Sequence, residues 1–458
     1  MIHAYKSNGY NIIIDANSGS VHAVDEVAFD AIANYEQMER PALTAFLLDK
    51  YKDNPDVTEA EIEELYADIE ELKKEGRLFT EDKFTKVAFD FKKRQSVIKA
   101  MCLHVAHGCN LSCKYCFAGE GEYHEKGLMS FEVGKAAFDY LIAHSGTRRH
   151  LEVDFFGGEP TLNFEVVKQL VAYGRSLEKE HNKEFRFTFT TNGLLVDDEV
   201  MDFCNREMHN VVMSLDGRKC VNDRMRVNKA GKGCYDTIVP KFQKWADQRG
   251  QENYYIRGTY THHNPDFASD ILHMADLGFK QISIEPVVAP ATADYALTKE
   301  DLPTLLEQYD ILAKEMLKRE EKGNGFTFYH YMIDLEGGPC IVKRISGCGV
   351  GTEYMAVTPT GDIYPCHQFV GDEKFKLGNI FTGLENTDIL DEFKYCNVYA
   401  HPECNDCFAR FYCSGGCAAN AYYSTGSIRG VYELGCELHR KRIEAAIMIR
   451  VAQSMREE

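Results

Sequence analysis

The sequence predicts an α/β protein whose central part is a partial barrel of parallel strands. Between about residues 97 and 325, strand-like runs alternate six times with amphipathic helical stretches, a pattern typical of serial βα units. A smaller α+β segment precedes this part, and a cysteine-rich segment follows it. With 458 residues, 44% of them hydrophobic, the chain is long enough for two or three domains with their own cores.

Composition excludes several classes of partner and location. The formal charge is −19 and no lysine- or arginine-rich block occurs, so we expect no nucleic acid partner. Neither a secretion signal nor an apolar run of membrane-spanning length is present, and we expect a cytoplasmic protein without membrane association. Sixteen cysteines in a reducing compartment are more often metal ligands than disulfides.

The first segment, residues 1 to 85, predicts a small module of strands followed by helices. The apolar spacing indicates strands at 2–7, 10–15 and 20–25, then helices at 26–35, 43–51 and 58–76. The charged stretch 79–96 is predicted to be a surface linker.

The first predicted barrel strand, 98–106, leads into "HGCNLSCKYCFAG". Ligands bind at the carboxyl ends of barrel strands, so Cys109, Cys113 and Cys116 are expected at the barrel mouth. Three thiolates indicate a [4Fe–4S] cluster with one open iron, although buried free thiols or a zinc site remain alternatives. The histidines that would complete a zinc site are His104, His107 and His124.

The spacing Cys-x₃-Cys-x₂-Cys, with the aromatic Tyr115 before the last cysteine, resembles the radical S-adenosylmethionine (SAM) enzymes. The resemblance implies that the open iron of the cluster is chelated by the amino and carboxylate groups of SAM. It also implies that electron transfer from the cluster cleaves SAM to a 5′-deoxyadenosyl radical, which abstracts hydrogen from the substrate.

Four further predicted strands, at 151–158, 185–191, 211–217 and 254–260, precede a sixth at 281–288, and the first three end in polar motifs. "FFGGEP" resembles the family's motif for the SAM amino group, and its glycines allow close backbone approach. "TTNG" and "MSLDG" are expected to face the ribose or carboxylate, and the arginine of "NDRMRV" either pairs with the carboxylate or is a surface residue. The candidate SAM-binding residues are Tyr115, Gly157, Gly158, Glu159, Thr191, Asn192, Ser214, Asp216 and Arg226.

The cysteines of the last segment resemble the SPASM extension of radical SAM enzymes, which implies two auxiliary [4Fe–4S] clusters and three clusters in all. A zinc ribbon is the alternative for part of this pattern. By the resemblance, the first auxiliary cluster takes Cys348, Cys366 and Cys417, and the second takes Cys404, Cys407, Cys413 and Cys436. Cys340 is the expected fourth ligand of the first, unless a substrate thiolate takes that place. The five other cysteines, expected to be core or incidental thiols, are Cys102, Cys204, Cys220, Cys234 and Cys396.

Three domains follow from these resemblances. Residues 1–85 resemble the winged-helix, PqqD-like recognition element of enzymes that modify ribosomally made peptides (RiPPs), which binds a leader peptide as an added strand. Residues 86–325 form the radical SAM partial barrel, and 326–458 form the SPASM domain. A dimerisation or DNA-binding role is the alternative for the first module, and the acidic charge disfavours DNA.

This domain order resembles the sactipeptide-type maturases that form thioether links from cysteine sulfur to an α-carbon, and "HVAHGCNLSCKYCFAGEG" resembles the SCIFF maturases in particular. The implied partners are a short cysteine-rich precursor peptide and a reducing donor such as flavodoxin or ferredoxin. One alternative is an anaerobic sulfatase maturase, which oxidises a cysteine or serine to formylglycine. The other is a non-enzymatic iron–sulfur scaffold that binds peptide.

Overall fold

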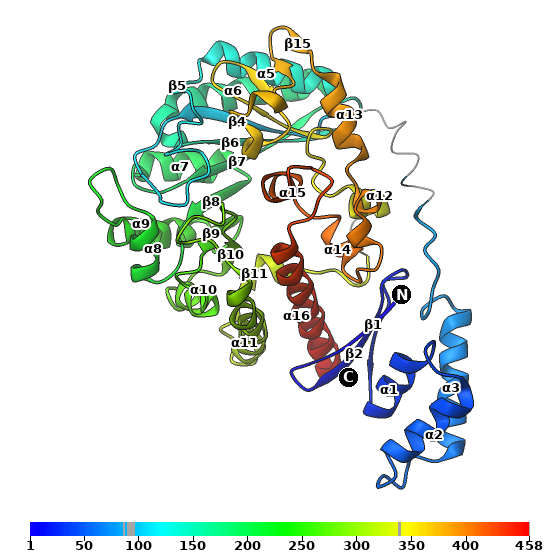
Figure 1. Cartoon of the computed structure of the whole chain (residues 1–458). Coiled ribbons are helices and arrows are strands. Elements are labelled where there is room, and N and C mark those ends of the chain that lie inside the picture. The colour runs from blue at the N-terminus through cyan, green and yellow to red at the C-terminus, as the bar shows by residue number, and fades with distance from the viewer. Residues whose placement is uncertain (86–87, 89–96, 338–339, 458) are drawn as a thin grey trace.

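A computed structural model describes residues 1–85, 88, 97–337 and 340–457 (Figure 1). The N-terminal segment folds into an antiparallel sheet of order β1-β2-β3 beside three helices, close to the predicted bounds. A two-residue turn of Asn8 and Gly9, both with positive φ, joins the first two strands, as tight hairpins require. The elements are β1 (Ile2–Ser7), β2 (Tyr10–Asp15), β3 (Val21–Val24), α1 (Glu26–Asn34), α2 (Arg40–Lys50) and α3 (Glu59–Lys74).

The six predicted barrel strands are present and parallel, which confirms the α/β prediction. They lie in the order β10-β9-β8-β7-β6-β4. The central strand β4 is buried along its whole length, as expected for a parallel strand covered on both faces. The bounds are β4 (Ala100–His107), β6 (His150–Gly157), β7 (Glu184–Thr191), β8 (Asn210–Ser214), β9 (Tyr254–Tyr260) and β10 (Gln281–Pro286).

The sheet extends beyond the six strands at both ends. β11 (Thr327–Phe328) pairs with β10, and β12 (Tyr354–Val357), from the cysteine-rich segment, pairs in parallel with β4. An antiparallel edge follows at β13 (Asp362–Tyr364), β14 (Gly378–Asn379) and β15 (Gly383–Leu384). The C-terminal segment is therefore joined to the barrel by backbone hydrogen bonds.

Helices that follow the strands pack against the outer side of the sheet (Figure 1). Two of them begin at a side-chain cap: the Ser130 and Asp197 side chains accept hydrogen bonds from the backbone N–H of Val133 and Val200. The helices are α5 (Phe131–His144), α6 (Phe164–His181), α7 (Asp198–Glu207), α8 (Lys219–Met225), α9 (Tyr235–Gln248), α10 (Phe267–Asp276) and α11 (Leu302–Glu321).

The C-terminal segment ends in the long helix α16, which runs from this segment to the N-terminal module (Figure 1). Its Glu444 accepts hydrogen bonds from Tyr5 through the backbone carbonyl, and its carboxylate pairs with His3 at 2.8 Å. Within the described ranges, no helix combines the length and apolar character needed to span a membrane. The helices are α12 (Ile341–Ser346), α13 (Thr387–Tyr395), α14 (Arg410–Cys413), α15 (Ala418–Thr425) and α16 (Glu433–Glu457).

The predicted linker 79–96 differs from a free surface chain in the part that is described. Tyr399 donates from its hydroxyl to both carboxylate oxygens of Asp82 at 2.9 Å, and Phe84 packs edge-on against Phe411 with ring centroids 5.5 Å apart. The sequence of the linker did not predict these contacts, because their partners lie more than 300 residues away along the chain. Residues 86–87 and 89–96 lie outside the described residues.

Candidate functional site

The three-cysteine loop follows β4 and borders a cavity of ≈ 290 Å³ at the carboxyl ends of the strands. Cys109, Cys113 and Cys116 all line this cavity. The Cys109 sulfur accepts hydrogen bonds from the backbone N–H of Leu111 at 3.4 Å and from Asn192 Nδ2 at 3.5 Å. The loop thus presents its thiols to a space that the neighbouring strand ends also face.

Burial disfavours free thiolates at two of these cysteines. It is the main cause that raises the pKa of Cys109 to about 11 and that of Cys113 to about 12, and the neighbouring Cys116 contributes to both rises. A bound metal deprotonates such thiols, because coordination stabilises the thiolate. In the part of the chain that is described, no three Cys, His, Asp or Glu side chains converge closely enough to hold a single metal ion.

Two of the histidines named for a zinc site, His104 and His107, contact each other. His104 Nδ1 and His107 Nε2 are 3.1 Å apart, and His107 Nδ1 lies 3.0 Å from the backbone carbonyl of Glu125. Both ring nitrogens of His107 are therefore occupied, and burial lowers the pKa of His107 to about 4. His104 Nε2 is buried without a hydrogen-bond partner among the described residues.

The Gly-Gly motif lies directly against the cysteine loop. A Cβ at Gly157, where φ is +125°, would lie 2.3 Å from the carbonyl oxygen of Ala106, and one at Gly158 would lie 2.1 Å from that of Gly108. Gly158 N–H donates to the Ala106 carbonyl at 2.8 Å. Only glycine permits this approach, so the motif fixes the cysteine loop against the second strand.

Glu159, after β6, binds the loop after β7 directly and the three-cysteine loop after β4 through Asn192. Its carboxylate accepts from Thr191 Oγ1 at 2.8 Å, from the Asn192 backbone N–H at 2.8 Å and from Thr161 Oγ1 at 2.7 Å. Asn192 in turn donates from Nδ2 to Asn110 Oδ1 at 2.7 Å. Burial raises the pKa of Glu159, and these hydrogen bonds oppose that rise. Glu159 and Asn192 therefore position the cysteine loop and also line the cavity.

Asp216 and Arg226 form an ion pair at the cavity wall, with the Asp216 carboxylate fully buried and the Arg226 side chain 12% exposed. Arg226 Nε donates to Asp216 Oδ1 at 3.1 Å, and Tyr115 donates from its hydroxyl to Asp216 Oδ2 at 2.6 Å. The backbone N–H of Thr259 adds a third donor to the same carboxylate at 3.1 Å. Arg226, Tyr115 and Ser214 line the cavity. Asp216 is fully buried and orients the first two.

Replacing Asp216 by Ala should destabilise the protein by about 3–5 kcal/mol, because the change leaves the buried Arg226 guanidinium without its charge partner. Urea unfolding of the metal-free protein measures this loss. The double variant Asp216→Ala/Arg226→Met removes both charges and should be less destabilised than Asp216→Ala alone. Equal or additive destabilisation in the double variant would show that the pair is not coupled.

Sequence reasoning missed cavity residues from later strands and from the C-terminal segment. Arg257 of β9 and Glu285 of β10 line the cavity, as do His367, Gln368 and Asn420 beyond the barrel. A charged residue in the middle of "YYIRGTY" was a usable signal for Arg257, because it interrupts an otherwise apolar and aromatic strand at the position that the folded strand leaves exposed to the cavity. The C-terminal residues carried no such signal, since only folding brings them to the strand ends.

The cysteines of the first proposed auxiliary site lie within electrostatic range of one another. Burial raises the pKa of Cys366, and Cys417 and Cys348 raise it further. Cys340 is exposed at the start of α12. Cys396, expected to be incidental, also lies near this group, because Cys348 and Cys417 add to the burial that raises its pKa to about 12.

The structure offers a test between Cys340 and Cys396 as a further ligand. Cys396 Sγ donates to the carbonyl of Ile428 at 3.1 Å, which requires a protonated thiol. We therefore expect Cys340→Ala to change the spectrum of the first auxiliary cluster and Cys396→Ala to leave it unchanged. Mössbauer and paramagnetic resonance spectra of the two variants check this. The reverse outcome would assign Cys396 instead.

The four cysteines of the second proposed auxiliary site line a separate cavity of ≈ 190 Å³. Two guanidinium groups border it: Arg440 hydrogen-bonds Cys407, and Arg410 is 6% exposed. Cationic donors beside four thiols fit a cluster of negative net charge. The lining cysteines are Cys404, Cys407, Cys413 and Cys436.

The remaining thiols differ in exposure, and Cys102 lies near Cys366 of the first auxiliary set. Cys102, Cys204 and Cys234 are buried, and Cys220 is exposed on α8.

Two family models match the chain. Residues 103–247 match the radical SAM superfamily, and residues 348–408 match the iron–sulfur cluster-binding domain called SPASM. A cysteine-type anaerobic sulfatase-maturating enzyme of Clostridium perfringens is 25% identical over 334 residues, which cover 68% of this chain and 86% of that protein. The radical SAM cyclopropyl synthase TigE of Paramaledivibacter caminithermalis is 21% identical over 76% of this chain and 74% of its own.

Solved structures share the fold. Native anSMEcpe with bound AdoMet and the Kp18Cys peptide superposes with a TM-score of 0.64 at 21% identity, over 78% of this chain and 99% of its own. Streptococcus suis SuiB bound to its precursor peptide SuiA superposes with a TM-score of 0.52 at 17% identity, over 94% and 97%. The second match extends over more of this chain than the first.

Proposed function

We propose, from a radical SAM domain followed by a SPASM domain, that this protein modifies a ribosomally made, cysteine-rich precursor peptide by forming a thioether between a cysteine sulfur and an α-carbon. The observation that carries this proposal is the shared wall between the two sites. Gln368 lines the cavity of the three-cysteine loop and also lies 4.0 Å from Cys417 of the first auxiliary set. A peptide in this cavity lies beside both groups of cysteines.

The reaction requires one hydrogen atom, one proton and one electron to leave the peptide. With three [4Fe–4S] clusters and SAM bound, the cofactors supply a reductively formed 5′-deoxyadenosyl radical and accept an electron. The hydrogen atom from the α-carbon ends in 5′-deoxyadenosine, and the thiol proton goes to solvent. The remaining electron requires an acceptor, and auxiliary clusters held by the two C-terminal sets of cysteines would supply one. A flavodoxin or ferredoxin is the proposed reducing donor.

The chain's own residues would position these components. Glu159 and Asn192 hold the cysteine loop, and Arg226 and Ser214 face the cavity from the next strand end. Arg257 lines the same cavity, and no hydrogen bond or ion pair with another described residue engages its guanidinium. We assign it to binding the peptide backbone or a carboxylate, for which a guanidinium fork is suited.

The N-terminal module is proposed to bind the leader of the precursor along β3. Ala23 of β3 pairs with Ile12 of β2, which also pairs with Tyr5 of β1. Because the two-residue hairpin closes at Ser7 and Tyr10, and hydrogen-bonded pairs alternate, the hydrogen-bonding groups of Ile12 face β1. Those of Ala23 therefore face away from β2, at an edge open to an added strand.

Formylglycine formation is the second candidate, favoured by the sulfatase-maturating relatives. Mass spectrometry of the precursor after anaerobic reaction with SAM and a reductant distinguishes the candidates. A thioether loses two hydrogens and retains all sulfur, and deuterium placed on the acceptor α-carbon appears in 5′-deoxyadenosine. Loss of sulfur from the peptide, or loss of two hydrogens at a serine without transfer of the α-deuterium, would favour formylglycine. Absence of SAM cleavage with fully loaded clusters would leave only the scaffold interpretation.

A further inference from the structure

The segment between two cysteines of the second auxiliary set carries several of the contacts that dock the N-terminal module. Between Cys407 and Cys413, three side chains touch residues 1–85. The Phe408 ring stacks on His3, with centroids 3.6 Å apart and planes 3° apart. Phe411 meets Phe84 edge-on.

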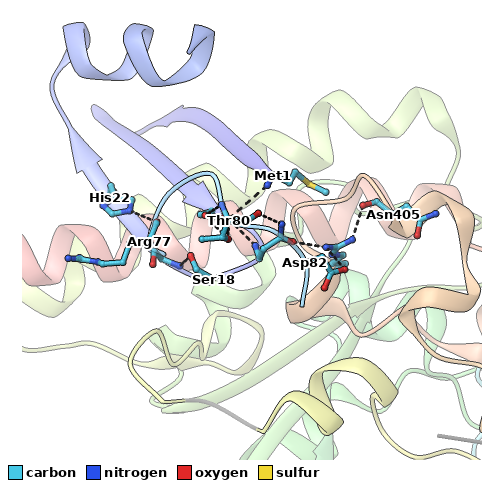
Figure 2. Close-up of polar contacts among 11 residues, drawn as sticks. Met1, Ser18, His22, Arg77, Thr80, Asp82 and Asn405 are labelled. Atoms are coloured by element: carbon cyan, nitrogen blue, oxygen red, sulfur yellow. Dashed lines mark hydrogen bonds and ion pairs between the residues drawn. The ribbon is translucent and has the colours of Figure 1, made fainter. Parts of the chain in front are cut away.

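The third contact is made by Arg410, which is buried in the interface. Its Nη2 donates to Asn17 Oδ1 at 2.6 Å and to Asp82 Oδ2 at 3.1 Å, and its Nη1 donates to the Asn405 carbonyl at 2.8 Å. Figure 2 shows Asp82, from the N-terminal segment, and Asn405, from the segment between Cys404 and Cys413, joined through this network. The Arg410 guanidinium thus links the segment between Cys404 and Cys413 to the N-terminal module.

The module side of this network is fixed by its own core. Asn17 donates from Nδ2 to the Thr80 carbonyl at 2.6 Å, and Thr80 donates from its backbone N–H and its hydroxyl to Asp15 at 2.8–2.9 Å. Asp15 is fully buried at the end of β2. Arg410 therefore binds acceptors whose positions depend on the folded module.

Arg410 also lines the cavity of the second auxiliary set, and one of its N–H donors has no partner among the described residues. Its Nε is buried, and among the described residues it has no hydrogen-bond partner. Arg410 lines the ≈ 190 Å³ cavity together with all four cysteines of the second set. A buried N–H beside four thiols is placed to donate to a cluster sulfur.

We infer that the N-terminal module is a structural part of the second auxiliary cluster site, and that Arg410 is the positioning residue through which the docked module holds the ligand loop in its cluster-binding form. A metal site is stable only as far as its ligands are held together by the fold. Without Asn17 and Asp82, the buried guanidinium loses its charge partner and its fixed orientation. The inference uses the iron–sulfur cluster of the proposed function but not its peptide substrate.

The test is the rate at which iron leaves the anaerobically reconstituted full chain for a chelator. The phase that belongs to the second site is the one missing in Cys404→Ala/Cys407→Ala. That phase should accelerate by about 10- to 100-fold in Arg410→Gln and in Asn17→Ala/Asp82→Asn, the factor expected for a lost buried hydrogen bond to a charged group. Arg40→Gln is the matched control, because Arg40 lies on the same module and pairs with Glu63 at its surface.

The inference is supported if only the second-site phase accelerates while Arg40→Gln behaves as the wild type. It is overturned if Asn17→Ala/Asp82→Asn releases iron at the wild-type rate, or if all phases accelerate by the same factor. If Arg410→Gln does not fold, the module-side variant decides alone, since its substitutions lie outside the cysteine-rich segment. No peptide is present, so a precursor that remains unmodified would refute the proposed function and leave this result unaffected.

Discussion

Replacing Cys109, Cys113 and Cys116 together by Ala should abolish SAM cleavage and leave about eight iron atoms per chain, since two auxiliary [4Fe–4S] clusters hold four each. The loss is complete because these three thiols line the cavity at the strand ends, and the auxiliary cysteines surround other spaces. Iron analysis and formation of 5′-deoxyadenosine measure the two effects.

The matched control for this triple variant is Cys220→Ala, which removes an exposed thiol on α8. It should retain full iron content and full SAM cleavage. Residual SAM cleavage in the triple variant, iron near zero, or one or more zinc ions per chain in anaerobically prepared protein would refute the assignment of these cysteines.

Replacing Ala23 by Pro should weaken precursor binding by about tenfold or more, because it removes a backbone N–H from the free edge of β3. The ladder between β2 and β3 keeps its hydrogen bonds, since those of Ala23 face outward. Fluorescence anisotropy of a labelled precursor measures the affinity. SAM cleavage without peptide should remain as in the wild type.

Ala23→Val is the matched control, because it keeps the N–H and favours a strand. Equal affinity of the Pro and Val variants would place the leader elsewhere. Deleting residues 1–85 is a weaker experiment, since it would also expose Phe408, Arg410 and Phe411, which lie between Cys407 and Cys413. A point substitution at the edge separates leader binding from the module's contact with the SPASM domain.

Local patterns predicted the elements of this fold well. β1 and β2 begin and end where the apolar alternation of "IHAYKS" and "YNIIID" places them, and each of the six barrel strands is present. The three-cysteine loop and the Gly-Gly motif were evident because their spacing is itself the signal. The sequence predicted only that the glycines allow close backbone approach. The structure identifies the approaching groups as the carbonyls of Ala106 and Gly108, which exclude a side chain there.

Contacts between distant segments were beyond such patterns. β12 is a four-residue apolar run that no periodicity assigns to a strand, and its partner β4 lies some 250 residues earlier. Arg226 reads equally as a surface residue until Asp216 and Tyr115 are seen around it. Arg410 and Asn17 are separated by 393 positions, and nothing in either neighbourhood indicates the other.

The contact between β1 and α16 has a consequence for how the chain is made. Tyr5 and Glu444 are 439 positions apart, so a ribosome must synthesise nearly the whole polypeptide before β1 can contact α16. The N-terminal module has its own core around Tyr66 and Leu47 and can fold early. Its contacts with α16 therefore form last, after Cys404, Cys407 and Cys413 have been made, and the docked module then covers the segment between Cys407 and Cys413.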